Sequence, residues 1–192
     1  SRMLSRMEAA RFSVDGDGME VPAVLTSPAK QRAALLLVPG WMNVDVEGNF
    51  APMFPGQVQV NPWVYKQLAE QLTARGLAVL RFSTTGPGTG CVTRDEARVK
   101  AHYGEFPHRV SVAAQFLDEL QRRAPGLPVV TAGHSEGAVV VTQLARRRED
   151  LQGIILLSGP AKPLLALMIW QQYETQQRTE GPDAARTAEY EQ

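Results

Sequence analysis

Continuous apolar runs separated by amphipathic stretches fill most of the chain after residue 33. The runs occupy residues 34–38, 77–82, 128–132 and 154–157. Such runs are typical of strands that are buried on both faces of a parallel sheet. Between them, apolar residues recur at helical spacing and predict three amphipathic helices. Because strands that alternate with helices form βαβ units, the sequence predicts an α/β fold, a mostly parallel sheet with helices on both faces.

Turn-forming residues mark the start of the fold and both ends of the first helix. Residues 11–25 predict an antiparallel β-hairpin whose turn, at 15–18, contains two glycines. Because proline cannot donate to a strand ladder, Pro22 predicts that the second hairpin strand lies at a sheet edge. The first helix is expected to begin at Asn61, a preferred N-cap that is followed by proline, and to stop at Gly76.

Two long loops interrupt the alternation, at residues 39–60 and 83–106. Both follow the C-terminal ends of predicted strands, where open α/β sheets place their sites, and loops of this length are usually functional. The first loop is unusually apolar, which fits either a wall that binds an acyl group or packing of the loop on itself. The apolar residues in and just after this loop are Trp41, Met42, Phe50, Met53, Phe54 and Trp63.

The sequence Gly133-His134-Ser135-Glu136-Gly137 lies between a predicted buried strand and a predicted helix. A G-x-S-x-G motif in this context is typical of a nucleophile elbow, a sharp turn that lifts a serine hydroxyl above the sheet. Side chains two residues before and after the serine would collide with neighbouring backbone, so both positions favour glycine. The following helix directs its positive end toward an oxygen that becomes negative during acyl transfer. The alternative is a Gly-Ser turn that caps a helix.

With several other segments in the same order, this motif resembles the α/β-hydrolase superfamily, and within it the bacterial esterases and serine-aminopeptidase-like hydrolases. The resemblance covers residues 10–175 and implies a mostly parallel sheet with an antiparallel hairpin at one edge. The other segments are LLLVPG at 35–40, LAEQL at 68–72, GLAVLRF at 76–82, GPGTG at 86–90 and LSGP at 157–160.

This resemblance implies roles for five residues. Ser135 would be the catalytic nucleophile, and Gly133 and Gly137 would be the glycines that the elbow needs on either side of it. The backbone N–H groups of Glu136 and Trp41 would form the oxyanion hole. Losing one such donor typically costs about 3 kcal/mol of transition-state stabilisation, so the position of the Trp41 peptide is important.

The chain departs from the family pattern at two positions near this site. Relatives often carry His-Gly after the first buried strand, where this chain has Pro-Gly-Trp at 39–41. That difference leaves the oxyanion donor possible, because the donor is a backbone N–H. Relatives also usually carry Asp at the position of Ser83, and the sequence does not explain this second difference.

The family triad follows the chain order serine, acid, histidine, but all three histidines, His102, His108 and His134, precede Ser135. His102 and His108 could approach from the second long loop, although solvated positions are the simpler interpretation. A serine without a general base is a poor nucleophile at neutral pH. The sequence therefore does not account for ordinary triad catalysis by these residues alone.

A long apolar strand at 154–157 would be an open sheet edge unless further strands follow it. Together with the missing histidine, this leads us to expect that the 192 residues are the front part of a larger hydrolase. The expected domains are an α/β-hydrolase core at 10–160 and the start of a helical lid or C-terminal extension at 161–192.

Composition narrows the classes of partner and site. Basic and acidic residues number 20 each and give no net charge to attract nucleic acid or an anionic membrane. The apolar runs are too short for a membrane span, and the single cysteine, Cys91, excludes an internal disulfide. The same cysteine count excludes a four-cysteine zinc site, and the glycine-rich turn at 86–90 lacks dinucleotide-binding spacing. We expect no cofactor and no metal. The first seven residues lack the apolar run of a signal peptide, which favours a cytoplasmic location.

The sequence favours a carboxylesterase-like serine hydrolase that cleaves small acyl esters through a Ser135 acyl-enzyme. Thioesterase, acyltransferase or peptidase chemistry would use the same residues. The alternative is a catalytically silent hydrolase-like domain that binds a ligand or a partner in the same cleft. The intact elbow favours the enzyme, and the missing histidine favours the alternative. The expected partner is a small-molecule ester, and the chain's own remaining segment or a second copy could complete the site.

Overall fold

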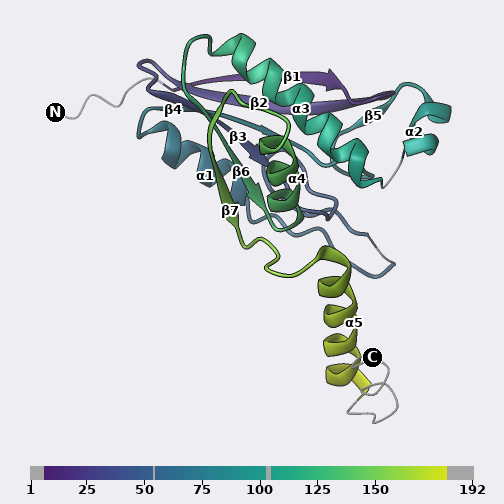
Figure 1. Cartoon of the computed structure of the whole chain (residues 1–192). Helices are drawn as coiled ribbons and strands as arrows, with labels where there is room; N and C mark the ends of the chain where they lie inside the picture. The colour runs from purple at the N-terminus through teal and green to yellow at the C-terminus, as the bar shows by residue number, and fades with distance from the viewer. Residues whose placement is uncertain (1–6, 54, 103–104, 181–192) are drawn as a thin grey trace. The chain divides into compact units, whose positions relative to one another are not determined.

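The structure is a computed structural model that describes residues 7–53, 55–102 and 105–180 (Figure 1). The chain divides into two compact units, Ser1–Gly159 and Pro160–Gln192. The second unit contains helix α5 (Leu164–Glu180). The first contains β1 (Met7–Asp15), β2 (Met19–Pro28), β3 (Ala33–Val38), α1 (Val64–Thr73), β4 (Leu77–Phe82), β5 (Val92–Thr93), α2 (Glu96–His102), α3 (Phe106–Arg123), β6 (Val129–His134), α4 (Glu136–Ala145) and β7 (Leu151–Leu157).

One sheet joins all seven strands in the order β1-β2-β4-β3-β6-β7, and the short β5 pairs with β2. Strands β4, β3, β6 and β7 run parallel, whereas β1 and β2 form the antiparallel hairpin at one end. The predicted α/β fold is therefore confirmed. The parallel register pairs Val38 with Gly133 and Gly133 with Leu156. The loops that follow β3, β6 and β7 thus leave the sheet at the same edge.

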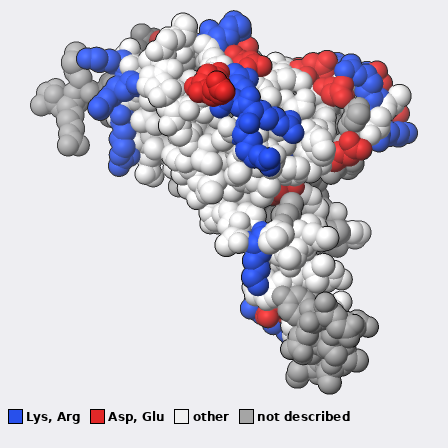
Figure 2. Space-filling view, in the orientation of Figure 1, with Lys and Arg blue, Asp and Glu red and all other residues white. Residues whose placement is uncertain are grey.

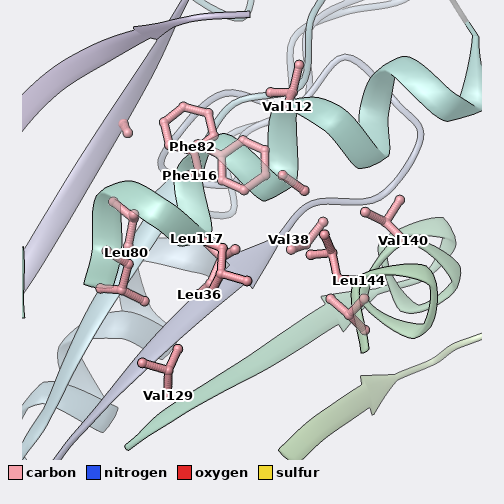
Figure 3. Close-up of a cluster of buried hydrophobic side chains, with 14 of the residues drawn as sticks. Leu36, Val38, Leu80, Phe82, Val112, Phe116, Leu117, Val129, Val140 and Leu144 are labelled. Carbon is pink, nitrogen blue, oxygen red and sulfur yellow. The ribbon is translucent and has the colours of Figure 1, made fainter. Parts of the chain in front are cut away.

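Alternate side chains of the central strands pack into two hydrophobic clusters, one on each face of the sheet. Helices α3 and α4 cover one face and α1 covers the other (Figure 1). Leu36 of β3 belongs to the cluster under α3 and α4, whereas the adjacent Leu35 belongs to the cluster that includes residues of α1. Figure 3 shows the first cluster, in which the rings of Phe82 and Phe116 stack with centroids 4.2 Å apart.

The prediction that Pro22 places its strand at a sheet edge is wrong. Strand β2 pairs with β1 on one side and with β4 and β5 on the other. Pro22 lies between the segments that pair with β5 and with β4, and its carbonyl accepts the N–H of Ser83 at 3.1 Å. Pairing with β5 ends at Glu20 and pairing with β4 begins at Ala23. Pro22 therefore lies where no partner strand needs a backbone N–H from β2.

The prediction that Asn61 caps the first helix is also wrong. The N-cap of α1 is Trp63, which has a left-handed backbone with φ 48°. The Asn49 side-chain oxygen accepts the N–H of Trp63 at 3.0 Å, and the Glu47 carbonyl accepts the N–H of Lys66 at 3.1 Å. The preceding loop therefore satisfies N–H groups at the helix start that a local cap would otherwise bind.

Charges of both signs are mixed on the face that Figure 2 shows. Arg148 forms ion pairs with Asp118 at 2.6 Å and with Asp150 at 2.8 Å, and Arg122 pairs with Glu119 at 2.6 Å. Exposed pairs of this kind stabilise a fold by only about 0–1 kcal/mol each. Among the described residues, no helix combines the length and apolar character that crossing a bilayer requires.

Strand β7 is the last strand of the described sheet and pairs there with β6 alone. Its side chains Ile154, Ile155 and Leu156 are between 38% and 54% exposed. An apolar strand with one free side is unusual among natural sheet edges, which are mostly short, charged or covered.

Candidate active site

Ser135 occupies a strained turn between β6 and α4. Its backbone angles are φ 54° and ψ −121°, a combination that L-residues rarely adopt. Its N–H donates to the carbonyl of Leu157 at the end of β7, at 2.8 Å, and its own carbonyl accepts the N–H of Ala138 at 3.0 Å. Because both backbone groups are bonded, the turn is fixed to the sheet on one side and to the helix on the other.

Close backbone contacts explain the glycines on either side of this turn. A Cβ at Gly133 would lie 2.1 Å from the carbonyl oxygen of Gly137. A Cβ at Gly137 would lie 2.5 Å from the carbonyl oxygens of both Val38 and Pro39. Both distances are far below ordinary van der Waals contact. Residues 133–137 therefore need glycine at both ends so that α4 can pack directly against the end of β3.

The loop that follows β3 reaches the same turn. A Cβ added to Gly40 would lie 3.3 Å from the Cβ of Ser135 and 3.3 Å from the carbonyl oxygen of His134. Trp41 comes next, and its side chain is 55% exposed. The structure thus brings together Ser135, Glu136 and the Gly40–Trp41 peptide, which are the backbone groups expected to form an oxyanion hole.

A salt bridge anchors the same loop further along. Arg81 of β4 is only 4% exposed, and its guanidinium donates to the carbonyl of Val46 at 3.1 Å and to the Glu47 carboxylate at 2.6 Å. Although burial acts to raise the pKa of Glu47, the bonds from Arg81 and Arg11 together lower it. These bonds attach the loop to strand β4 of the sheet.

The apolar residues of this loop divide between packing and exposure. Phe50 packs against the cluster under α1, whereas Met42 and Trp63 are 40% and 49% exposed. Phe54 lies outside the described residues. Packing of the loop on the fold therefore accounts for Phe50, whereas Trp41, Met42 and Trp63 remain exposed. Trp41 and Met42 follow Gly40, the loop residue that meets Ser135.

Tyr65, a buried residue of α1, connects this loop to the elbow. Its hydroxyl accepts the N–H of Gly40 at 3.3 Å and lies 3.0 Å from Nδ1 of His134. Burial raises the pKa of Tyr65 and lowers the pKa of His134, so both are neutral at pH 7. Since the Tyr65 oxygen already accepts from Gly40, its proton is available to donate to Nδ1. Tyr65 thus links the β3 loop to His134.

Arg109, on α3, contacts both sides of the candidate oxyanion hole. Its Nη2 donates to the carbonyl of Gly40 at 2.6 Å, and its Nη1 binds the carboxylate of Glu136. The Arg109 and Glu136 side chains are only 15% and 11% exposed. Burial lowers the pKa of Arg109 and raises that of Glu136, and the attraction between them opposes each shift.

A small pocket opens beside Arg109, where the ends of β3 and β4 meet α3 and α4. Ser83 lines it and is fully buried, with its hydroxyl 3.3 Å from the sulfur of Cys91. A carboxylate in place of Ser83 would lose its hydration at this depth, so the neutral residue suits the surroundings. The pocket is lined by Val38, Pro39, Phe82, Ser83, Thr84, Thr85, Arg109, Val112 and Val140.

The structure places the other histidines on helices of the first unit. His102 is the last residue of α2, and His108 lies in the first turn of α3. Among the side chains that the structure describes, no imidazole hydrogen-bonds to the Ser135 hydroxyl, and the adjacent His134 bonds to Tyr65 instead. The described residues therefore hold a candidate nucleophile and candidate oxyanion donors without a base in contact.

The model of the serine aminopeptidase S33 hydrolase family matches residues 61–176. The chain belongs to this family. The match includes residues 133–137, α3 with Arg109, and the strands β4, β5, β6 and β7. Comparison with curated proteins found no match.

Several solved structures share the fold. A thermostable carboxyl esterase from Bacillus coagulans, solved with glycerol, has a TM-score of 0.59 and 16% identity, covering 88% of this chain and 50% of its own. A cold-adapted esterase from an Arctic intertidal metagenomic library has a TM-score of 0.52 and 23% identity, covering 81% and 60%. A dienelactone hydrolase-like promiscuous phosphotriesterase from metagenomic libraries has a TM-score of 0.53 and 19% identity. The match covers 80% of this chain and 59% of the phosphotriesterase. These likenesses establish the fold, and the chain spans 50–60% of the length of these three proteins.

Proposed function

We propose that this chain carries the nucleophile and the oxyanion hole of a serine hydrolase that cleaves small acyl esters. Ser135 Oγ attacks the ester carbonyl carbon, and the N–H groups of Trp41 and Glu136 donate to the oxygen that becomes negative. Loss of the alcohol leaves an acyl group on Oγ, and water then releases it as the acid. The observation that carries this proposal is the strained backbone of Ser135 between two glycines and beside Gly40.

The conformation of Ser135 argues against a simple helix cap. An ordinary N-cap serine has an extended backbone, and its side chain accepts an N–H from the first turn. Ser135 has a positive φ and makes no side-chain cap hydrogen bond. Such a backbone costs about 1–3 kcal/mol. A turn that only capped α4 would avoid this cost, whereas a nucleophile must project its hydroxyl away from the sheet.

Apolar side chains around Ser135 support an acyl substrate. Trp41 and Met42 follow Gly40 directly and are 55% and 40% exposed. Sites that bind small organic molecules are lined mostly by apolar and aromatic groups. We place the acyl chain on Trp41 and Met42, because they continue the loop that meets Ser135 through Gly40. The charged side chains described beside Ser135, Arg109 and Glu136, pair with each other, and this favours esters over peptides.

We place the general base and its acid partner in the part of the protein outside the 192 residues. Within the described part, no imidazole contacts the Ser135 hydroxyl, and the chain spans only 50–60% of the three structures compared above. The same observation favours the second candidate, a silent hydrolase-like domain that binds its ligand without cleaving it.

The test uses the protein encoded by the complete reading frame. Ser135→Ala is compared with Ser111→Ala, an exposed serine on α3, in p-nitrophenyl butyrate turnover and in labelling by a fluorophosphonate. The wild type and Ser111→Ala should hydrolyse the ester and react with the fluorophosphonate. Ser135→Ala should hydrolyse the ester at least about 10³-fold more slowly and should not be labelled. A folded wild type that neither labels nor turns over any ester would support the silent binding domain and overturn the hydrolase.

A further inference from the structure

Arg109 is a largely buried charged group that contacts both Gly40 and Glu136, and no sequence motif marks it. We propose that Arg109 is a positioning residue that assembles the oxyanion hole. Its planar guanidinium fixes the distance between the Gly40–Trp41 peptide and Glu136. The N–H groups of Trp41 and Glu136 can then donate to the same substrate oxygen. This inference rests on the proposed function, because it assigns a role within that site.

Arg109 fixes the peptide that joins Gly40 to Trp41. In a trans peptide, the carbonyl and the next N–H are coplanar and point in opposite directions. Arg109 Nη2 binds the Gly40 carbonyl at 2.6 Å, and this bond fixes the direction of the Trp41 N–H. The N–H of Gly40 is itself held by Tyr65 at 3.3 Å. Glycine rotates more freely than other residues, so a donor next to Gly40 needs restraint on both sides.

Arg109 also binds Glu136, the first residue of α4. Nη1 of the same guanidinium binds its carboxylate, and both side chains are largely buried. Because the guanidinium is rigid and planar, its two contacts fix the distance between the β3 loop and the start of α4. The pairing also neutralises the Glu136 charge, which would otherwise repel a developing oxyanion. A lysine offers a single point charge and lacks this fork.

A purely structural role would give a different pattern of effects. If Arg109 only stabilised the fold, its replacement would lower stability and leave the active molecules with normal kinetics. A positioning role affects the transition state more than the bound substrate, because only the transition state carries the negative oxygen. The affinity for a trifluoromethyl ketone, whose serine adduct places a negative oxygen in the hole, should therefore fall together with kcat.

The experiment compares Arg109→Met and Arg109→Lys with Arg122→Met in the protein from the complete reading frame. Arg122 lies on the same helix, its side chain is 67% exposed and it pairs with Glu119. Arg109→Met should lower kcat by about 10- to 100-fold and should weaken binding of the trifluoromethyl ketone by a similar factor. KM should change by less than about threefold. Arg109→Lys should recover only part of kcat, and Arg122→Met should match the wild type.

A second measurement does not depend on activity. Amide hydrogen exchange at Gly40, followed by NMR, should become about tenfold faster or more in Arg109→Met, while exchange in β3 stays unchanged. If leaving Glu136 unpaired unfolds this variant, the double variant Arg109→Met/Glu136→Gln removes the unpaired charge and should still show fast Gly40 exchange. Unchanged exchange at Gly40, or a fall in kcat without weaker ketone binding, would overturn the proposal.

The two proposals can fail separately. A wild type that does not label at Ser135 refutes the hydrolase, and the exchange of Gly40 then still decides whether Arg109 holds the loop. A wild type that labels and turns over, beside an Arg109→Met variant with normal kcat, refutes the positioning role alone.

Discussion

Replacing Gly133 with alanine tests the geometry of the elbow most severely. The new Cβ would lie 2.1 Å from the carbonyl oxygen of Gly137 and 2.3 Å from its carbonyl carbon. Ordinary contact begins near 3.4 Å, so the end of β6 and the start of α4 must separate by about 1 Å or more. Both groups are backbone and cannot rotate away. We therefore expect a cost near the upper end of the usual overpacking range, about 3 kcal/mol.

The assay is urea unfolding of Gly133→Ala beside Gly153→Ala. Gly153 lies in β7, and a Cβ there would meet no atom within 4 Å. Because alanine suits a strand better than glycine, this control should gain about 0.5–1 kcal/mol. Movement of Ser135 by about 1 Å should also lower turnover by about 10²-fold in Gly133→Ala. Equal stability of Gly133→Ala and the wild type would refute the close packing of α4 on β6.

Three further predictions concern the residues around Gly40. Tyr65→Phe should lower the free energy of unfolding by about 1–3 kcal/mol in urea titrations, because Gly40 and His134 both lose a buried partner. An unchanged free energy of unfolding would contradict a stabilising role for the Tyr65 hydroxyl. Burial lowers the folded-state pKa of His134 below its ordinary 6.5, so this histidine's contribution to stability is complete above pH 6.5 and is lost as pH falls below it. The unfolding midpoint between pH 8 and pH 5 should therefore fall more in the wild type than in His134→Gln, and parallel curves would contradict this. Trp41→Ala keeps the backbone N–H, so the ratio of butyrate to acetate turnover should fall by roughly tenfold, and an unchanged ratio would remove Trp41 from the acyl site.

The sequence predicted those features that depend on local pattern. Buried parallel strands require continuous apolar runs, so β3, β4, β6 and β7 were visible as such runs. The strained turn at residues 133–137 was also predicted, because backbone contacts that any Cβ would break require its two glycines. The geometry of Gly133 and Gly137 explains why a five-residue motif carried so much information about the site.

Features that depend on distant partners could not be predicted. Arg109 reaches Gly40 and Glu136 across 69 and 27 residues of sequence, and nothing in its neighbours distinguishes it from other basic residues. The errors at Pro22 and Asn61 have the same origin. Local rules gave each residue a role, but the ladder of β2 needed no donor at Pro22, and the loop before α1 supplied the contacts that Asn61 was expected to make.

Trapping the acyl-enzyme shows directly whether Ser135 is the nucleophile. The protein from the complete reading frame is mixed with p-nitrophenyl butyrate, quenched in acid within one turnover and digested for mass spectrometry. The account predicts one butyryl group on the peptide that contains Ser135 and none in Ser135→Ala. A butyryl group on any other residue, or ester cleavage that persists in Ser135→Ala, would contradict it.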